Sequence, residues 1–161
     1  MKAKLILESG REIEMELTDE QTELVRKEAK WPQRGDWHFF LTAFGSVERG
    51  ILSDSLIDKA ALIIGNVFRT EQEAKNVARA LKLIEAIRQD RLELNGDWVP
   101  NNDHNNWSIH YSPKDFVVLR SSELYADTFG FFQSRNDAKQ VIEKHRSELL
   151  WYFTKFLPER G

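Results

Sequence analysis

Cysteine is absent from this chain of 161 residues. Its absence excludes disulfide bonds, thiolate metal sites and a cysteine nucleophile, and nothing in the composition requires an oxidising compartment. An excess of charge of one sign is also lacking, because 23 basic residues stand against 26 acidic ones, for a formal net charge of -3. A chain with this balance has no overall attraction for a phosphate backbone or for an anionic membrane surface.

Long hydrophobic runs are missing as well. The first ten residues, MKAKLILESG, hold too short an apolar run for a signal peptide. No later segment approaches the roughly 18 apolar residues that a membrane-spanning helix needs. We therefore expect a cytoplasmic protein, whose length allows one ordinary domain or two very small ones.

Sequence motifs of catalysis are also missing. No G-x-S-x-G, P-loop, H-E-x-x-H or G-x-G-x-x-G pattern occurs, and His38, His104, His110 and His145 lack the spacing of metal ligands. Strand alternation places His110 on the solvent face, and His145 falls in an apolar helical stripe, as a hydrogen-bonded core or boundary histidine does. We expect no catalytic, cofactor-binding or metal-binding residue, and so no enzyme.

The N-terminal residues predict a hairpin followed by a short helix. Residues 4–17, KLILESGREIEMEL, alternate apolar and polar side chains on both sides of Ser9-Gly10. Thr18 and Gln21 have the spacing of a capping box, which marks the start of a helix. That helix ends before Trp31-Pro32, since the residue before a proline avoids helical backbone angles.

From Trp37 onward the pattern predicts three strands and a helix. Two β-rich runs flank Gly45-Ser46, a polar loop occupies 53–60, and LIIGNVF (62–68) supplies the third strand. The helix follows Thr70 as N-cap and runs to about Leu92. Its inward stripe is predicted from apolar residues at helical spacing, namely Ala74, Val77, Ala78, Leu81 and Ile84.

Residues 107–157 repeat this order of elements. Strands are predicted at WSIHYS (107–112), FVVLR (116–120) and TFGFF (128–132), and a helix follows Ser134. The junctions VFRTEQEAK (67–75) and FFQSRNDAK (131–139) also share a pattern. We interpret the repeat as an internal duplication, and the alternative is that a common strand-to-helix junction arose twice.

These elements predict an α+β fold. An N-terminal β-hairpin and short helix precede two duplicated β-β-β-α modules, each a small antiparallel sheet with one covering helix. The predicted domains are residues 1–34, a first module at 35–94, a loop at 95–106 and a second module at 107–161.

Four apolar residues are predicted to bind a partner. The C-terminal helix carries LLWYFTKFL (149–157), whose inward stripe leaves Leu150, Trp151 and Leu157 on other faces. Either the rest of the chain covers them, or a partner or second subunit does, because large apolar patches usually mark interaction sites. Trp98 lies among turn formers in a loop suited to recognition, and it can equally tuck into the cleft between modules.

Several phrases of the sequence resemble one family. They are W-P-x-x-G-D-W-H-F-F, G-N-V-F-R-T-E-Q-E-A at 65–74, W-S-I-H-Y and F-F-Q-S-x-x-x-A, which follow an acidic N-terminal hairpin. In this order they resemble small uncharacterised proteins encoded in phages and prophages of Gram-positive bacteria. The resemblance covers most of the chain and implies an accessory protein of a mobile element, a class that includes inhibitors of host defence. It brings no catalytic residues with it.

A weaker resemblance is to the DNA-binding modules of the AP2 and integrase-arm type, in which a three-stranded sheet precedes a helix that opens with G-x-F-x-T-x-E-E-A. Those domains read DNA with arginines and aromatic residues on the exposed sheet face. Here the first two strands of the first module carry only Arg49, which leaves little for phosphate contact.

The function predicted from the sequence is therefore that of a non-catalytic phage or prophage protein. It would act in the host cytoplasm by binding another protein, such as a host defence nuclease, in the manner of an anti-CRISPR protein. A nucleic-acid-binding or regulatory module of the AP2-like plan is the alternative, and an enzyme without a recognised motif is the third hypothesis. Self-association stays open, and no cofactor or membrane partner is expected.

Overall fold

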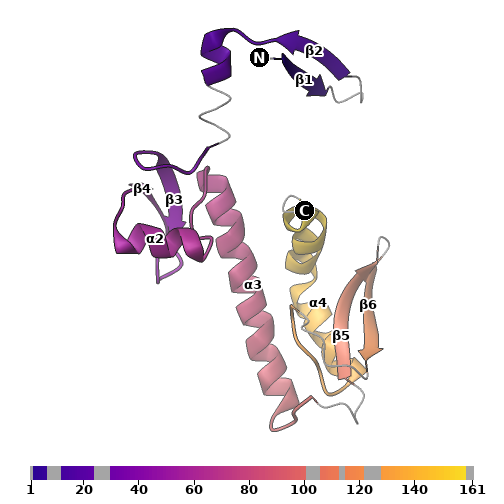
Figure 1. Cartoon of the computed structure of the whole chain (residues 1–161). Helices are drawn as coiled ribbons and strands as arrows, with labels where there is room; N and C mark the ends of the chain where they lie inside the picture. Colours follow the sequence, from indigo (N-terminus) through magenta and orange to yellow (C-terminus); the bar gives the residue numbers. More distant parts are fainter. Residues whose placement is uncertain are drawn as a thin grey trace. The chain divides into compact units, whose positions relative to one another are not determined.

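The computed structural model describes residues 2–6, 12–23, 30–100, 106–112, 115–121 and 128–158, without the side chains of 2–6, 12–15 and 121. The chain divides into two compact units, Met1–Glu71 and Gln72–Gly161. Figure 1 labels the helices and strands of both units. Helices occur together with small antiparallel sheets of two strands each, so the predicted α+β class is confirmed.

The first unit begins with the predicted β-hairpin. β1 (Lys2–Ile6) pairs antiparallel with β2 (Glu12–Glu16), and Lys2 lies opposite Glu16. The predicted turn at Ser9-Gly10 lies outside the described residues.

A helix follows this hairpin and has the predicted capping box. The Thr18 backbone N–H donates to Oε1 of Gln21 at 3.0 Å, and the Gln21 N–H donates to Oγ1 of Thr18 at 3.2 Å. Two free backbone donors are thus satisfied reciprocally. Residues 19–23 are helical, residues 24–29 lie outside the described part, and Trp31 is no longer helical, as predicted.

The second sheet of this unit has two strands instead of the predicted three. β3 (Trp37–Leu41) pairs antiparallel with β4 (Val47–Ile51). From the predicted third strand only Phe68 pairs, through two backbone hydrogen bonds to Phe39 of 2.8 and 2.9 Å. The next pair of hydrogen bonds comes from the side-chain amide of Asn66, which accepts from the N–H of Leu41 and donates to its C=O, each at 2.8 Å.

The prediction of a polar loop at 53–60 is also wrong, because a helix, α2 (Leu56–Ile63), occupies most of these residues. Ser55 caps this helix by accepting a hydrogen bond from the Asp58 N–H at 3.1 Å. Gly65, with φ of 71°, follows its C-terminal end. A short apolar run fits a strand and a helix equally well, and here the cap favours the helix.

α3 (Glu71–Asn95) contributes apolar side chains to the core of the second unit, and Ala74, which was predicted to face inward, is buried. That α3 covers the first sheet stays a prediction. Ala80, Leu83 and Ile87 of this helix are buried in the core of the second unit. Leu81, which was predicted to face inward, is 53% exposed. The buried residues recur every three or four positions, so Leu81 points about 100° away from Ala80.

The second unit continues with a hairpin and a capped helix. β5 (Asn106–Ser112) pairs antiparallel with β6 (Asp115–Ser121), and of the predicted third strand only Phe132 pairs, with Trp107. α4 (Arg135–Trp151) has the predicted N-cap, because the Asp137 N–H donates to Oγ of Ser134 at 3.1 Å. A π-helical turn, η1 (Tyr152–Phe156), extends α4.

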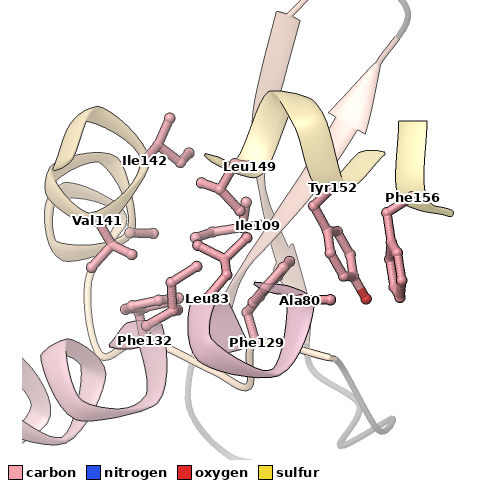
Figure 2. Close-up of a cluster of buried hydrophobic side chains, with 12 residues drawn as sticks. Ala80, Leu83, Ile109, Phe129, Phe132, Val141, Ile142, Leu149, Tyr152 and Phe156 are labelled. Carbon is pink, nitrogen blue, oxygen red and sulfur yellow. The ribbon is translucent and has the colours of Figure 1, made fainter. Parts of the chain in front are cut away.

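The core of the second unit lies between α3, α4 and one face of the β5–β6 sheet (Figure 2). The inward stripe predicted for α4 is confirmed, since Val141, Ile142 and Leu149 are buried. Buried members of the cluster are Ala80, Leu83, Ile87, Ile109, Phe129, Phe132, Ala138, Val141, Ile142, Leu149, Tyr152 and Phe156.

The two predicted modules share features without proving a duplication. In each, a two-stranded hairpin is joined on its first strand by one bridge to a phenylalanine, Phe68 or Phe132, that closely precedes a helix. Helix α2 occupies the connection in the first, whereas the corresponding residues 122–127 lie outside the described part of the second. Both the duplication and the predicted domain boundaries stay predictions.

Candidate functional site

The most exposed apolar residues on any helix of the described chain lie on α2 and at its C-cap. Leu56, Ile57, Ile63 and Ile64 are 85, 81, 85 and 74% exposed, and no residue of α2 is buried. We refer to these four residues as the α2 patch. Apolar surface concentrated in this way on a folded protein usually marks an interaction site.

Hydrogen bonds at the N-terminal end of α2 hold the patch in place. The carboxylate of Asp58 accepts from the backbone N–H of Ser53 at 2.8 Å and also from the Ser53 hydroxyl. These bonds, with a further one from Ser55, lower the pKa of Asp58. The charge of Asp58 is thus engaged inside the turn, which leaves Lys59 as the other charged residue of the helix.

The β3–β4 sheet has two unlike faces. On one face His38 is buried and lies opposite Gly50, where an added Cβ would come within 3.4 Å of the imidazole Cε1. On the other face Trp37 is exposed, and the guanidinium of Arg49 lies 4.0 Å over its ring. Among the described residues, none forms a hydrogen bond with Nδ1 of His38.

Trp151, one of the predicted partner-binding residues, is half-buried and has a contact within its own unit. The Arg79 guanidinium lies 3.9 Å over the Trp151 ring and forms two hydrogen bonds, of 2.7 and 2.8 Å, to Glu148. The centroid of the Trp151 ring is also 5.5 Å from that of the Phe156 ring. Leu150 and Leu157 are exposed, so three predicted residues lie near one another at the end of α4.

Trp98, the fourth predicted residue, lies elsewhere in the second unit. It follows the C-terminal end of α3, where its N–H donates to the Asn95 carbonyl at 3.0 Å, and it is half-buried. Arg79, the residue of α3 that contacts Trp151, precedes Asn95 by about 24 Å of helix at 1.5 Å per residue. The structure therefore does not join Trp98 and Trp151 into one surface.

Asp90 is the centre of an ionic cluster between α3 and α4. One carboxylate oxygen lies 2.7 Å from Nζ of Lys144, and the other lies 2.7 Å from Nε2 of His145. Burial raises the pKa of Asp90, but the hydrogen bonds from these two residues outweigh that effect and hold it below its usual value. His145 is thus the hydrogen-bonded boundary histidine that the sequence predicts, and its backbone departs from helical angles.

The two remaining histidines are His104 and His110. His110 is exposed, as predicted, and its Nε2 lies 2.8 Å from the hydroxyl of Ser108. His104 lies outside the described residues. Among the described residues, no group of three or more histidine, aspartate or glutamate side chains has the geometry of a metal site.

The α2 patch was missed because the predicted elements divide it in two: Leu56 and Ile57 fall in the predicted loop at 53–60, and Ile63 and Ile64 fall in the predicted strand at 62–68. One signal could have revealed it: Ser55 stands three residues before Asp58, in the spacing of an N-cap, and apolar residues follow at helical intervals. In the described part of the chain, none of the helices combines the length and apolarity that crossing a bilayer requires. A comparison of the chain with protein-family models, curated proteins and solved structures finds no match.

Proposed function

We propose that this protein is a non-catalytic binding protein that inserts α2 into an apolar groove of a partner protein. The exposure of the four residues of the α2 patch carries this proposal. An amphipathic helix that lays its apolar side chains into a groove is a common mode of protein recognition. Transfer of isoleucine and leucine side chains out of water supplies the driving force.

A groove on another protein suits this helix better than a second copy of the same helix does. α2 has 8 residues, so it is about 12 Å long. Two such convex helices touch along one short line, whereas a stable interface buries roughly 800 Å² on each partner. A concave partner surrounds the helix on more sides and therefore buries more of each side chain.

The biological setting belongs to the same proposal. The resemblance to phage and prophage proteins of Gram-positive bacteria supports an accessory role in the host cytoplasm. Within that role, the partner would be a host protein such as a defence nuclease, which binding would inhibit. The resemblance alone supports this step.

A nucleic-acid-binding module is the second candidate, favoured by the Trp37 and Arg49 pair on the exposed face of the β3–β4 sheet. Exposed aromatic rings can stack on bases, and arginine contacts phosphates. However, Glu48 and Glu71 line the same cavity as Arg49, and their carboxylates repel a phosphate backbone. This opposition makes nucleic acid the weaker candidate.

The test compares the intact protein with a variant whose α2 patch is charged. Ile57→Lys with Ile63→Lys alters two exposed side chains, and Leu81→Lys on α3 is a control at another exposed apolar position. We expect a host protein captured from lysate by the parent and the control to be lost with the α2 variant, while circular dichroism and melting stay unchanged.

Titration of that purified host protein then separates the two candidates. An apolar interface gives a negative heat-capacity change and binding that is nearly insensitive to salt, whereas phosphate contact weakens steeply as salt rises. Capture that the α2 variant retains in full would overturn the proposed docking helix. Binding of nucleic acid with a steep salt dependence would favour the second candidate.

A further inference from the structure

The backbone groups along the outer edge of β6 can be assigned from the pairing of β5. The N–H and C=O of Trp107 on β5 bond Phe132, on the side of β5 away from β6. In an antiparallel pair, the residue opposite such a residue also directs its backbone groups outward. Arg120 lies opposite Trp107, so Arg120 and, two residues away, Val118 direct their N–H and C=O groups to the outside of the sheet.

Within the described chain, nothing pairs with this edge. β6 forms a sheet with β5 alone, and the described chain supplies no partner for the outward groups of Val118 and Arg120. Phe116 is the next outward residue, but its N–H already donates to the Asp115 carboxylate at 2.8 Å. The free edge is therefore confined to the second half of β6, where a short added strand would fit.

A groove lies between α4 and residues 115–118 of β6, so it meets the free edge at Val118. Its volume is about 320 Å³, and its apolar lining includes Phe116, Val118 and Ile142. Arg135 and Lys139 of α4 also line it. They lie four residues apart, so they share one face of the helix.

The ion pairs of this groove lie at one of its ends. Arg146 is bound to Asp115 at 2.7 Å and to Glu143 at 3.1 Å, which neutralises the end of the groove near the start of β6. Arg135 and Lys139 form no ion pair with any described residue and precede Arg146 by two to three helical turns. The other end of the groove therefore carries two cations that no carboxylate of the described residues pairs with.

We propose that the β6 edge and this groove bind an extended acidic segment of another protein as an added antiparallel strand. The backbone of the added segment would form hydrogen bonds with Val118 and Arg120. The acidic side chains of the segment, on the side toward α4, would contact Arg135 and Lys139. Alternate residues of such a strand lie on the opposite face, where Val117 and Leu119 are partly exposed. That face selects apolar residues, so the segment should alternate acidic and apolar side chains.

This site is separate from the α2 patch, and the two proposals can fail independently. The probe is a fluorescein-labelled hexapeptide of alternating glutamate and valine, titrated with the full-length protein by fluorescence anisotropy. One comparison peptide replaces glutamate with lysine. A second comparison peptide keeps the side chains but is N-methylated at alternate peptide nitrogens. The methyl groups remove the N–H donors that would pair with β6.

We expect the glutamate peptide to bind and both comparison peptides to bind at least about tenfold more weakly. Arg135→Gln with Lys139→Gln should weaken the glutamate peptide about tenfold as well. Lys82→Gln with Lys155→Gln removes the same net charge from exposed positions that do not line the groove, and it should bind like the parent. The variant of Ile57 and Ile63 should also bind normally.

Three results would overturn the inference. Equal binding of the glutamate and lysine peptides would remove the role of the cations, and unchanged binding of the N-methylated peptide would remove strand pairing. A protein dimer in sedimentation velocity that Arg135→Gln with Lys139→Gln dissociates would show that a second copy of the chain, instead of another protein, fills the groove.

Discussion

At Gly130 the absence of a side chain lets the Arg91 guanidinium lie against the backbone. A Cβ built there would come within 2.9 Å of both Cζ and Nε of Arg91, and the backbone has φ of 71°. Arg91 is partly buried, and burial, followed by the nearby charge of Arg88, lowers its pKa. No described residue accepts a hydrogen bond from Nε of Arg91, which packs against Gly130.

Gly130→Ala should therefore destabilise the protein by more than a backbone penalty alone. A left-handed conformation costs a non-glycine residue about 1–2 kcal/mol, and displacement of Arg91 adds to this cost. Gly96→Ala is the control, because Gly96 also has positive φ but open space around it. Urea unfolding should show a larger loss for Gly130→Ala, and equal losses would argue against the Arg91 contact.

The carboxylate of Asp90 gives a second prediction, on pH. Its pKa is lowered in the folded state, so its contribution to stability is present above the unfolded value of about 3.9 and is lost as pH falls through the folded value. Asp90→Asn should lower the free energy of unfolding clearly at pH 6 and much less at pH 3. Asp97→Asn, at an exposed position, should show no such difference. If Asp90→Asn lowers the free energy of unfolding equally at both pH values, the predicted contribution of the Asp90 carboxylate would be contradicted.

At the scale of elements, the end of α4 tests whether Trp151 serves the fold or a partner. Trp151 packs against the core and under Arg79, whereas its neighbour Leu150 is exposed. We expect Trp151→Ala to lower the free energy of unfolding by about 2–4 kcal/mol and Leu150→Ala to change it by less than about 0.5 kcal/mol. Thermal and urea unfolding measure both, and a parent-like Trp151→Ala would return this side chain to the partner surface.

The helices and strands also show how far the sequence predicts this fold. The caps at Thr18 and Ser134 and the inward stripe of α4 were predictable, because each depends on residues close together in the chain. The absence of a full third strand from each sheet was not predictable. A single bridging residue such as Phe68 pairs with the edge of the sheet, and the side chain of Asn66 takes the place of a backbone partner. Pairing of that kind leaves no periodic pattern in the sequence.

For the candidate site, composition pointed to the aromatic residues and not to the exposed aliphatic ones. The apolar run at 62–64 fits the start of a strand, and the cap at Ser55 is what distinguishes a helix there. The inward face of α3 depends on which unit it packs against, and that choice is made by tertiary contact. Leu81 was placed wrongly for this reason.

At the scale of the whole molecule, buried apolar side chains are distributed unequally between the two units. In the described residues of the first unit, Leu52 and Phe68 are the buried hydrophobic ones, and α2 buries none. The second unit has a cluster of buried aromatic and aliphatic side chains from α3, β5 and α4 (Figure 2). Burial of this kind is the main source of local stability, so the first unit should open more readily.

Hydrogen exchange measured by mass spectrometry should show this difference directly. We expect amides of α2 and of the β3–β4 hairpin to exchange through low-energy local opening, and amides of α3 and α4 to exchange only near the global free energy of unfolding. Low concentrations of urea should hasten exchange in the second group alone, since only large openings expose enough surface to depend on denaturant. Equal protection in both units would contradict the unequal cores. Binding of a partner to the α2 patch should then slow exchange in α2 first, because the least stable helix gains most from being covered.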